Sequence, residues 1–552
     1  MNAEQSGMAH SVVHRAHKNA GNENPLHDAL LSLILLLPVL VLVIASFLPG
    51  LSTNAAFPFP PLQYDQLFYP AAAREYADAA SFSFLYANPA DPSLYAPRIY
   101  FNLPVLVLGG LLALIPADPY LVFVLAGLAA AWLCLFTCVR FWRAFSGSKT
   151  SFTSPGIWIF CWGGGLFGLA GALYLLFDPA AFTGLFMLEP SRGWWALNWG
   201  RNLVLPLEAL YHLLFILMVY RVFKGKYLQA AGFCALLVLS HPFTGLQAGL
   251  ILLVWMLVER IVFVNRRIRL VHLLVPGLML AALLCYYLWF LNSYPSHRQV
   301  YDQWKLPLRL LPWQALLAYG MLVPAVLAAF WKSGCREFRT DPFARFLLVW
   351  MTISLLLVFH DCFLPARQPL HFTRGYLWLS LFLLSYPVLK SWLPGRPAGR
   401  SMLRRCFTVI LPVLLLSDNL CWFGLQIHEQ EQQYLPGRHR QEVLQHLAQT
   451  TGTGDLILSD DAEISYFALL YTPARALFSH WANTPAILEK IAAFNEFRMR
   501  GNLSPEWKNQ QPVLVLETRR NLSGLMQQRL REEYRLTFAN KEYRVYSHEP
   551  EE

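Results

Sequence analysis

Long apolar stretches, separated by short polar or basic segments, fill most of this 552-residue chain before residue 425. A helix needs roughly 20 consecutive apolar residues to cross about 30 Å of hydrocarbon. About eleven stretches approach that length, and they lie near residues 29–49, 119–139, 156–177, 204–222, 227–240, 245–263, 270–291, 313–331, 343–359, 376–393 and 406–424. The pattern predicts a polytopic α-helical membrane protein.

The segment at 103–116 is apolar but shorter than the others, and it contains Pro104 and the pair Gly109-Gly110. Its length favours a helix that lies along the outer leaflet or dips into it, and not a full crossing. If the segment does not cross, the Lys and Arg clusters all fall on the side of the N-terminus, and they lie at 140–149, 221–226, 260–269, 332–339 and 390–405. The positive-inside rule then predicts that this side is cytoplasmic.

The polar segments divide the chain into three parts. Residues 1–28 form a predicted cytoplasmic tail, residues 29–424 a membrane domain with a first outer loop at 50–118, and residues 425–552 an extracytoplasmic domain. The last part has a soluble pattern, in which helical stretches at 429–449, 464–470 and 485–500 alternate with short apolar runs at 456–458, 476–478 and 513–516. Such alternation predicts a small α/β domain with a parallel sheet.

Composition agrees with a membrane protein. The chain is 56% hydrophobic and 14% charged, with a mean hydropathy of +0.38, and a soluble protein of this length could not carry so much apolar surface. The formal net charge of +10 is explained by the basic clusters between spans, so we expect no nucleic-acid partner.

Asp65 is the acid of greatest interest in the first outer loop. It lies in Tyr64-Asp65-Gln66 among aromatic and proline residues, and a carboxylate in such surroundings loses hydration that its site must offset. A helix cap or an ion pair is the alternative role for an acid in this position. Glu75 and Asp78 lie in the helical stretch 71–80, where solvated or pairing acids are expected.

An enzyme that acts on a lipid-linked substrate also needs cations for a phosphate and a surface for a sugar or a prenyl chain. The other outer loops supply candidates for substrate binding, namely Arg374, Arg201, Arg192, His360, Asp361, Trp194 and Trp195. Arg374 enters a span, where an anionic partner would offset its charge, although snorkelling to the interface is an equal alternative. His360 and Asp361 could both reach a metal ion only from a loop.

The first outer loop resembles that of a known family. Its sequence carries Tyr64-Asp65-Gln66, then Ala71-Ala72-Ala73-Arg74-Glu75-Tyr76, then Pro97-Arg98-Ile99-Tyr100-Phe101-Asn102-Leu103-Pro104 before the short apolar helix. This layout resembles the GT-C superfamily of membrane glycosyltransferases, which contains protein O-mannosyltransferases, aminoarabinose transferases and oligosaccharyltransferases.

The resemblance implies a polyprenyl-phosphate sugar donor in the membrane lipid, an inverting transfer, and a catalytic acid at Asp65. A second acid of the family has its counterparts in Glu189, Asp302 or Asp361. Asp65 is a lone acid with no Asp-x-Asp after it, so the resemblance implies no certain cofactor and leaves a divalent cation as the one candidate.

We therefore expect a glycosyltransferase that moves a sugar to a lipid, glycan or protein acceptor on the extracytoplasmic face of a bacterial inner membrane. A transporter or flippase for lipid-linked glycans is the first alternative, and it would need a paired charge inside the membrane, for which Glu208 in the stretch 204–222 is the candidate. A polymerase or ligase of surface polysaccharide is the second alternative, suggested by the Arg and His residues of 360–375.

Overall fold

The computed structural model describes residues 24–78, 83–147, 154–178, 188–190, 197–305, 308–333, 336–390, 402–429, 435–501, 507, 510 and 512–548. The chain forms two compact units. The first unit combines Met1–Val43, Ala126–Cys285 and Lys305–Glu429, and the second combines Ile44–Leu125, Tyr286–Trp304 and Gln430–Glu552.

Long apolar helices confirm the polytopic membrane architecture. By length and composition, six helices of the described residues could cross a membrane, or up to eight if each bent pair is one span. The six are found in α2 (Pro25–Ser52), α5 (Pro119–Ser146), α9 (Pro206–Phe223), α11 (Pro242–Ile261), α12 with its continuation (Leu270–Ser293) and α19 (Met402–Glu429). The predicted number of about eleven spans is therefore not confirmed.

The other predicted spans are helical but broken or short. The stretch 156–177 folds as α6 (Pro155–Trp162) and α7 (Phe167–Phe177), bent by 79°, and 313–331 folds as α14 (Pro312–Tyr319) and α15 (Leu322–Ser333), bent by 66°. At the first break, a Cβ on Gly163 would lie only 2.3 Å from the Trp378 ring. Glycine therefore permits this close approach. The remaining predicted spans are the shorter helices α10 (Tyr227–Ser240), α17 (Pro342–Val358) and α18 (Tyr376–Leu389).

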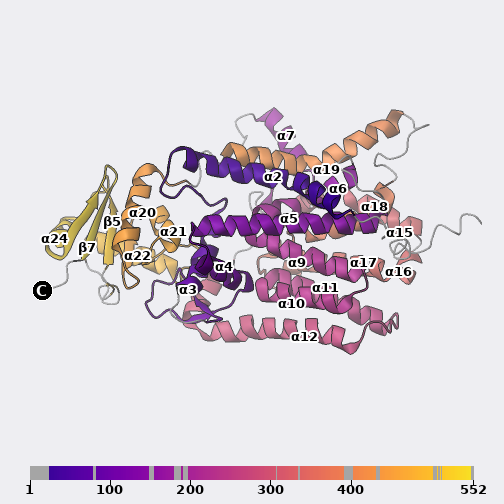
Figure 1. Ribbon diagram of the computed structural model, residues 1–552, viewed down its shortest axis with the longest axis horizontal. Coiled ribbons are helices and arrows are strands. Elements are labelled where there is room, and N and C mark those ends of the chain that lie inside the picture. The colour runs from indigo at the N-terminus through magenta and orange to yellow at the C-terminus, as the bar shows by residue number, and fades with distance from the viewer. Residues whose placement is uncertain are drawn as a thin grey trace, which may run out of the picture. The chain divides into compact units, whose positions relative to one another are not determined.

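Within the first unit, α9, α10, α11 and α12 run side by side (Figure 1). Helix α17 packs against α11 and α18, and α18 packs against α15. Large aromatic side chains fill the spaces between these helices, and Trp255, Trp350 and Trp378 are almost fully buried. The shorter elements of this unit are η5 (Gly200–Val204), α16 (Arg336–Thr340), η8 (His360–Cys362) and η9 (Pro369–Phe372).

The short apolar segment of the second unit forms helix α4 (Leu103–Leu114), capped by the Asn102 side chain, which accepts a hydrogen bond from the backbone N–H of Val105 at 3.2 Å. Twelve residues span about 18 Å as a helix, which is too short to cross the hydrocarbon. A Cβ on Gly109 would lie 2.7 Å from Tyr76, so the glycine lets α4 pack closely against α3 (Phe68–Ala77).

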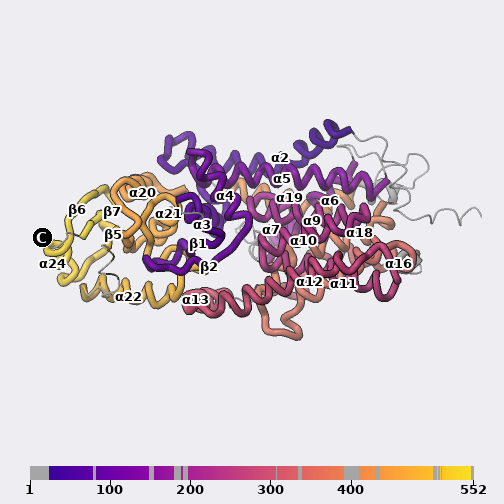
Figure 2. Tube along the Cα trace, turned by 60° about the horizontal axis from the view of Figure 1, so that its bottom comes forward, coloured from indigo at the N-terminus to yellow at the C-terminus, as the bar shows by residue number. Residues whose placement is uncertain are grey.

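The second unit contains a five-stranded sheet of order β4-β3-β5-β7-β6. Its strands are β3 (Leu456–Ser459), β4 (Arg475–Ala476), β5 (Pro512–Glu517), β6 (Tyr534–Ala539) and β7 (Tyr543–His548). The predicted parallel pairing holds for β3 with β4 and β5. It is wrong for the hairpin β6–β7, which joins β5 in antiparallel register and lies beside β5 in Figure 2. Most of β6 is exposed, so it lacks the apolar run by which the other strands were predicted.

Helices bury both faces of this sheet, which confirms a small α/β layer in the C-terminal part. Helices α22 (Ile487–Arg500) and α24 (Gly524–Glu533) pack on the face that carries Leu456, Leu458 and Leu514. The alternate residues Ile457 and Val515 are also buried, where α20 (Arg438–Thr450) and α21 (Ala462–Tyr471) contact the strands. The remaining elements of this unit are η2 (Tyr64–Leu67), β1 (Tyr86–Ala87), β2 (Arg98–Tyr100), η7 (Leu291–Ser293) and α13 (Pro295–Gln303).

Candidate functional site

Asp65 lies in the first turn of η2, which continues directly into α3. A carboxylate at the start of a helix is stabilised by the helix dipole. The Asp65 side chain is 52% exposed, and its Oδ1 lies 3.1 Å from Nε2 of His480, which is only 1% exposed. The sequence did not predict this partner, which is 415 residues away along the chain.

The contacts of His480 define which ring nitrogen carries the proton. Its Nδ1 lies 3.2 Å from the backbone N–H of Ala482 and 3.2 Å from Nδ2 of Asn483. Both groups are donors, so Nδ1 must accept and is unprotonated. In the neutral ring the proton is then on Nε2, from which it is donated to Asp65. His480 therefore holds the carboxylate from its buried side.

Aromatic residues of the first loop pack on His480 and do not enclose the carboxylate. The His480 ring centroid lies 5.0 Å from that of Tyr64 and 5.4 Å from that of Phe68. Tyr64 also stacks on Tyr466 at 4.5 Å, and its hydroxyl accepts a hydrogen bond from the backbone N–H of Trp481 at 3.0 Å. These contacts fix the loop after β4 and the histidine on it.

The second carboxylate oxygen of Asp65, Oδ2, makes no hydrogen bond with the described residues. Since the side chain is half exposed, this oxygen can accept a hydrogen bond from a bound hydroxyl group. Such a carboxylate can act as a general base or orient an attacking hydroxyl.

The surroundings of Asp65 do not fit a bound metal ion. Among the described residues no group of three or more His, Cys, Asp or Glu side chains could hold a metal. Among the residues that the structure describes, His480 is the side chain of a ligand type that contacts Asp65, and its Nδ1 already accepts hydrogen bonds. We therefore derive no step through a divalent cation.

Glu75 forms an ion pair, as expected for an acid of the helical stretch. Its Oε1 lies 3.3 Å from Nη2 of Arg475, and its backbone carbonyl accepts a hydrogen bond from Arg98 at 2.9 Å. Burial raises the pKa of Glu75 above its usual range, against the lowering effects of Arg475 and Arg98. These residues line a cavity of about 470 Å³ in the second unit.

Arg374, in the first unit, is buried and ion-paired. Its Nη1 contacts Oε1 of Glu208, and its Nη2 lies 2.6 Å from Nδ1 of His371. Its backbone carbonyl accepts a hydrogen bond from Nε2 of His212 at 2.9 Å. Glu208 lies in the first turn of α9 and not in the middle of that helix, so it is not a charge at the centre of a span.

The backbone at Arg374 is strained. Its φ is +26°, a conformation that non-glycine residues rarely adopt, and Gly375 follows with φ +76°. A Cβ on Gly375 would lie 2.3 Å from the backbone nitrogen of Trp199, so only glycine fits there. Backbone strain of this kind collects at functional sites.

His360 and Asp361 point to separate partners in the first unit. Nδ1 of His360 donates to the carbonyl of Leu357 at 2.7 Å, and its Nε2 accepts from the backbone N–H of Arg367 at 3.0 Å. Asp361 pairs with Arg309 at 3.2 Å. Both ring nitrogens of His360 are therefore engaged with the backbone.

Arg201 is enclosed by acids in the first unit. It is 1% exposed, and it pairs with Glu189 and, at 3.1 Å, with Asp418, while its Nε donates to Asn419 at 2.7 Å. The sequence did not single out Asp418, which lies within the predicted span 406–424. Substrate binding by Arg201 stays a prediction, as do the roles of Arg192, Trp194 and Trp195, which lie outside the described residues.

A partial signal for His480 is present in the sequence. It follows β4 at the carboxyl end of a parallel strand, where open α/β sheets place their ligands. No local pattern could connect it with Asp65, because the contact joins the first loop to the C-terminal part.

Comparisons with known proteins found similarity in structure alone. No protein-family model matches the sequence, and no curated protein matches it. The structure is similar to that of an oligosaccharyltransferase from Archaeoglobus fulgidus, with 10% identity and a TM-score of 0.47 over 88% of this chain and 69% of that one. It is also similar to ArnT from Cupriavidus metallidurans, with 12% identity and a TM-score of 0.45 over 93% of this chain and 97% of that one.

Proposed function

We propose that this protein is a membrane glycosyltransferase, with Asp65 as the catalytic base or acceptor-orienting group. The supporting observation is the Asp65–His480 pair, in which a buried histidine holds one oxygen of a half-exposed carboxylate at 3.1 Å and leaves the other oxygen open. A carboxylate that receives a proton from a bound hydroxyl must be held in position and must have an oxygen that the hydroxyl can reach.

In the proposed reaction, the acceptor hydroxyl attacks the anomeric carbon of a polyprenyl-phosphate sugar. The new carbon–oxygen bond forms as the bond to the phosphate oxygen breaks. The hydroxyl proton passes to Oδ2 of Asp65, and the polyprenyl phosphate leaves with the electron pair. Attack opposite the leaving group inverts the anomeric carbon. The acceptor is a lipid, a glycan or a protein.

The remaining substrate-binding predictions accompany this proposal. They assign phosphate or sugar contacts to Arg374, Arg201, Arg192, His360, Asp361, Trp194 and Trp195. We further propose that the protein lies in a bacterial inner membrane with its N-terminus in the cytoplasm and its C-terminal domain outside, as the basic clusters predict.

The variant Asp65→Asn tests the proposal. It keeps the size of the side chain and removes the base, so the turnover of a polyprenyl-phosphate sugar should fall by about 10²–10⁴-fold. Asp78→Asn is a matched control, because Asp78 is an exposed acid of the same loop that pairs with Arg74. If a folded Asp65→Asn protein turned over the donor as fast as the parent, Asp65 would have no catalytic role.

Transport of a lipid-linked glycan remains the first alternative. It would need a charged pair deep in the membrane, whereas Glu208 pairs with Arg374 at the first turn of α9. Movement of a labelled donor across proteoliposomes without bond cleavage would favour transport. Polymerisation or ligation of surface polysaccharide is the second alternative, and it would give a product with a lengthened or transferred glycan.

A further inference from the structure

A basic pocket lies at one end of the helices α9–α12, in the first unit. The turn between α9 and α10 and the loop between α11 and α12 line an open pocket of about 660 Å³. Lys226 lines it from the turn and Tyr227 from the start of α10, and Arg266, Arg267, Arg269 and His272 line it from the loop and the start of α12. These residues belong to the clusters that the positive-inside rule places in the cytoplasm.

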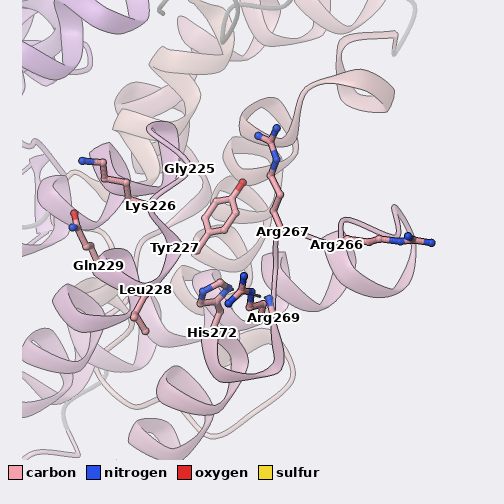
Figure 3. Close-up of a pocket in the computed structure, with 9 residues that line it drawn as sticks. All are labelled: Gly225, Lys226, Tyr227, Leu228, Gln229, Arg266, Arg267, Arg269 and His272. Carbon is pink, nitrogen blue, oxygen red and sulfur yellow. Dashed lines mark hydrogen bonds between the residues drawn. The ribbon is translucent and has the colours of Figure 1, made fainter.

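Some of the lining side chains lie near the middle of the pocket, and others extend away from it. Figure 3 shows Tyr227 near the centre, with Arg267, Arg269 and His272 beside it. Lys226 and Arg266 extend outward on opposite sides. The rings of Tyr227 and His272 lie 6.0 Å apart. Arg267 thus lies on one side of the Tyr227 ring in Figure 3, and Arg269 with His272 on the other. Arginine, hydroxyl and imidazole groups that line one pocket are suited to a phosphate-bearing ligand.

No ion pair among the described residues neutralises the positive charge of the pocket. None of Lys226, Arg266, Arg267 and Arg269 makes an ion pair with a described residue. The one acid close by in the sequence, Glu259, is taken by Arg345, whose Nη2 lies 2.9 Å from it, and by Asn265 at 3.0 Å. An anion from outside the chain is thus the natural counter-charge.

The pocket borders an exposed apolar surface. Leu228, which follows Tyr227 and lines the pocket, is 55% exposed. On α12, Leu270, Leu274 and Leu278 are 59%, 47% and 62% exposed, and their spacing of four residues puts them in one row on the helix. This row leads from the pocket along the helix, where it offers contacts for an acyl chain. A free phosphate ion would use none of them.

We propose that this pocket binds the phosphate headgroup of an anionic membrane lipid, with Arg267 and Arg269 as its main cationic contacts. The site is distinct from Asp65 and does not depend on the glycosyl-transfer proposal. The alternative, that these cations only orient the chain in the membrane, predicts no selective binding.

Native mass spectrometry of the purified full-length protein, titrated with phosphatidylglycerol or phosphatidylcholine, tests the proposal. Phosphatidylglycerol should bind more tightly. Each juxtamembrane cation strengthens binding about fivefold, so Arg267→Gln/Arg269→Gln should weaken phosphatidylglycerol binding about 25-fold. Lys332→Gln/Arg339→Gln removes the same charge from another predicted cytoplasmic segment and should leave binding unchanged. An equal loss of phosphatidylglycerol binding in both double variants would overturn the proposal. Equal binding of phosphatidylglycerol and phosphatidylcholine to the parent protein would do the same.

Inorganic phosphate, added as a competitor, distinguishes a lipid headgroup from a free phosphate ion as the ligand of this pocket. It should displace phosphatidylglycerol only in large excess, because it lacks the apolar contacts. Equal affinity for both would identify a site for free phosphate and refute the lipid site. A photoactivatable phosphatidylglycerol analogue needs no variant, and on the parent protein it should label residues 225–229 and 266–274. Labelling confined to other segments would contradict the proposal.

Discussion

His480 should position Asp65, and two substitutions can separate this role from the structural role of the same ring. In His480→Asn the amide oxygen takes the place of Nδ1, so the bond from the N–H of Ala482 is kept and the contact with Asp65 is lost. In His480→Gln the longer amide reaches Asp65, and the bond from Ala482 is lost instead. The two variants therefore separate the contact of Nε2 with Asp65 from the contact of Nδ1 with the N–H of Ala482.

The size of the effect follows from the exposure of the two groups. A hydrogen bond to a charged group contributes about 1.5–3 kcal/mol. Because the Asp65 side chain is 52% exposed, water screens the bond and we expect about 1 kcal/mol. A loss of this size lowers kcat about fivefold. His480→Gln should stay close to the parent in kcat but unfold more readily, by about 1–2 kcal/mol, because a buried N–H loses its acceptor.

Steady-state kinetics with a polyprenyl-phosphate sugar, together with thermal unfolding of each variant, provides the assay. We expect the fall in kcat in His480→Asn and the fall in stability in His480→Gln, with the donor KM unchanged in both. If activity instead followed stability across the two variants, His480 would have a structural role alone, and the positioning argument would be wrong.

Two further predictions concern other buried charges. Burial raises the pKa of Asp461, but hydrogen bonds from Tyr543 and Arg440 hold it below its usual value, so its stabilisation is present at neutral pH and is lost as the pH falls through the lowered pKa. Asparagine can still cap α21, but it removes the charge that pairs with Arg440. Asp461→Asn should therefore speed amide exchange in α21 at neutral pH by an amount equivalent to about 1–2 kcal/mol. A difference from the parent that persisted in strong acid would contradict this. Arg374→Gln should cost about 3–5 kcal/mol of unfolding free energy by leaving Glu208 unpaired, and the double variant Glu208→Gln/Arg374→Gln should recover most of it. If Arg374 binds the donor phosphate, the double variant keeps a raised donor KM, whereas a parental KM would leave Arg374 with a structural role.

Helices and strands were predicted correctly from the sequence where one local pattern of apolar residues is enough to specify them. Helices α2 and α5 carry apolar runs that exceed the span length, and the strands β3 and β5 are short apolar runs between helices. Asp461 is of a type that favours the position before a helix, and it caps α21. Its neighbour Asp460 is of the same type, but its Oδ1 accepts from the backbone N–H of Glu517 on β5.

Features that depend on tertiary packing were missed. Apolar composition did not show that α6 and α7 are bent by 79°, because the break depends on Trp378 and other residues that approach the glycines from distant segments. The amphipathic hairpin β6–β7 lacks a continuous apolar run. For the same reason the sequence pointed to Asp65, and in part to His480, without connecting them, since the contact between them exists only in the folded chain.

The product of the reaction tests the central claim most directly. Purified protein in proteoliposomes would be incubated with polyprenyl-phosphate sugars and membrane extracts, and lipids, glycans and proteins would be analysed by mass spectrometry. We predict an acceptor heavier by one sugar residue, with release of free polyprenyl phosphate, in the parent and not in Asp65→Asn. A donor that crosses the bilayer intact, with no acceptor modified by the parent protein, would contradict the account.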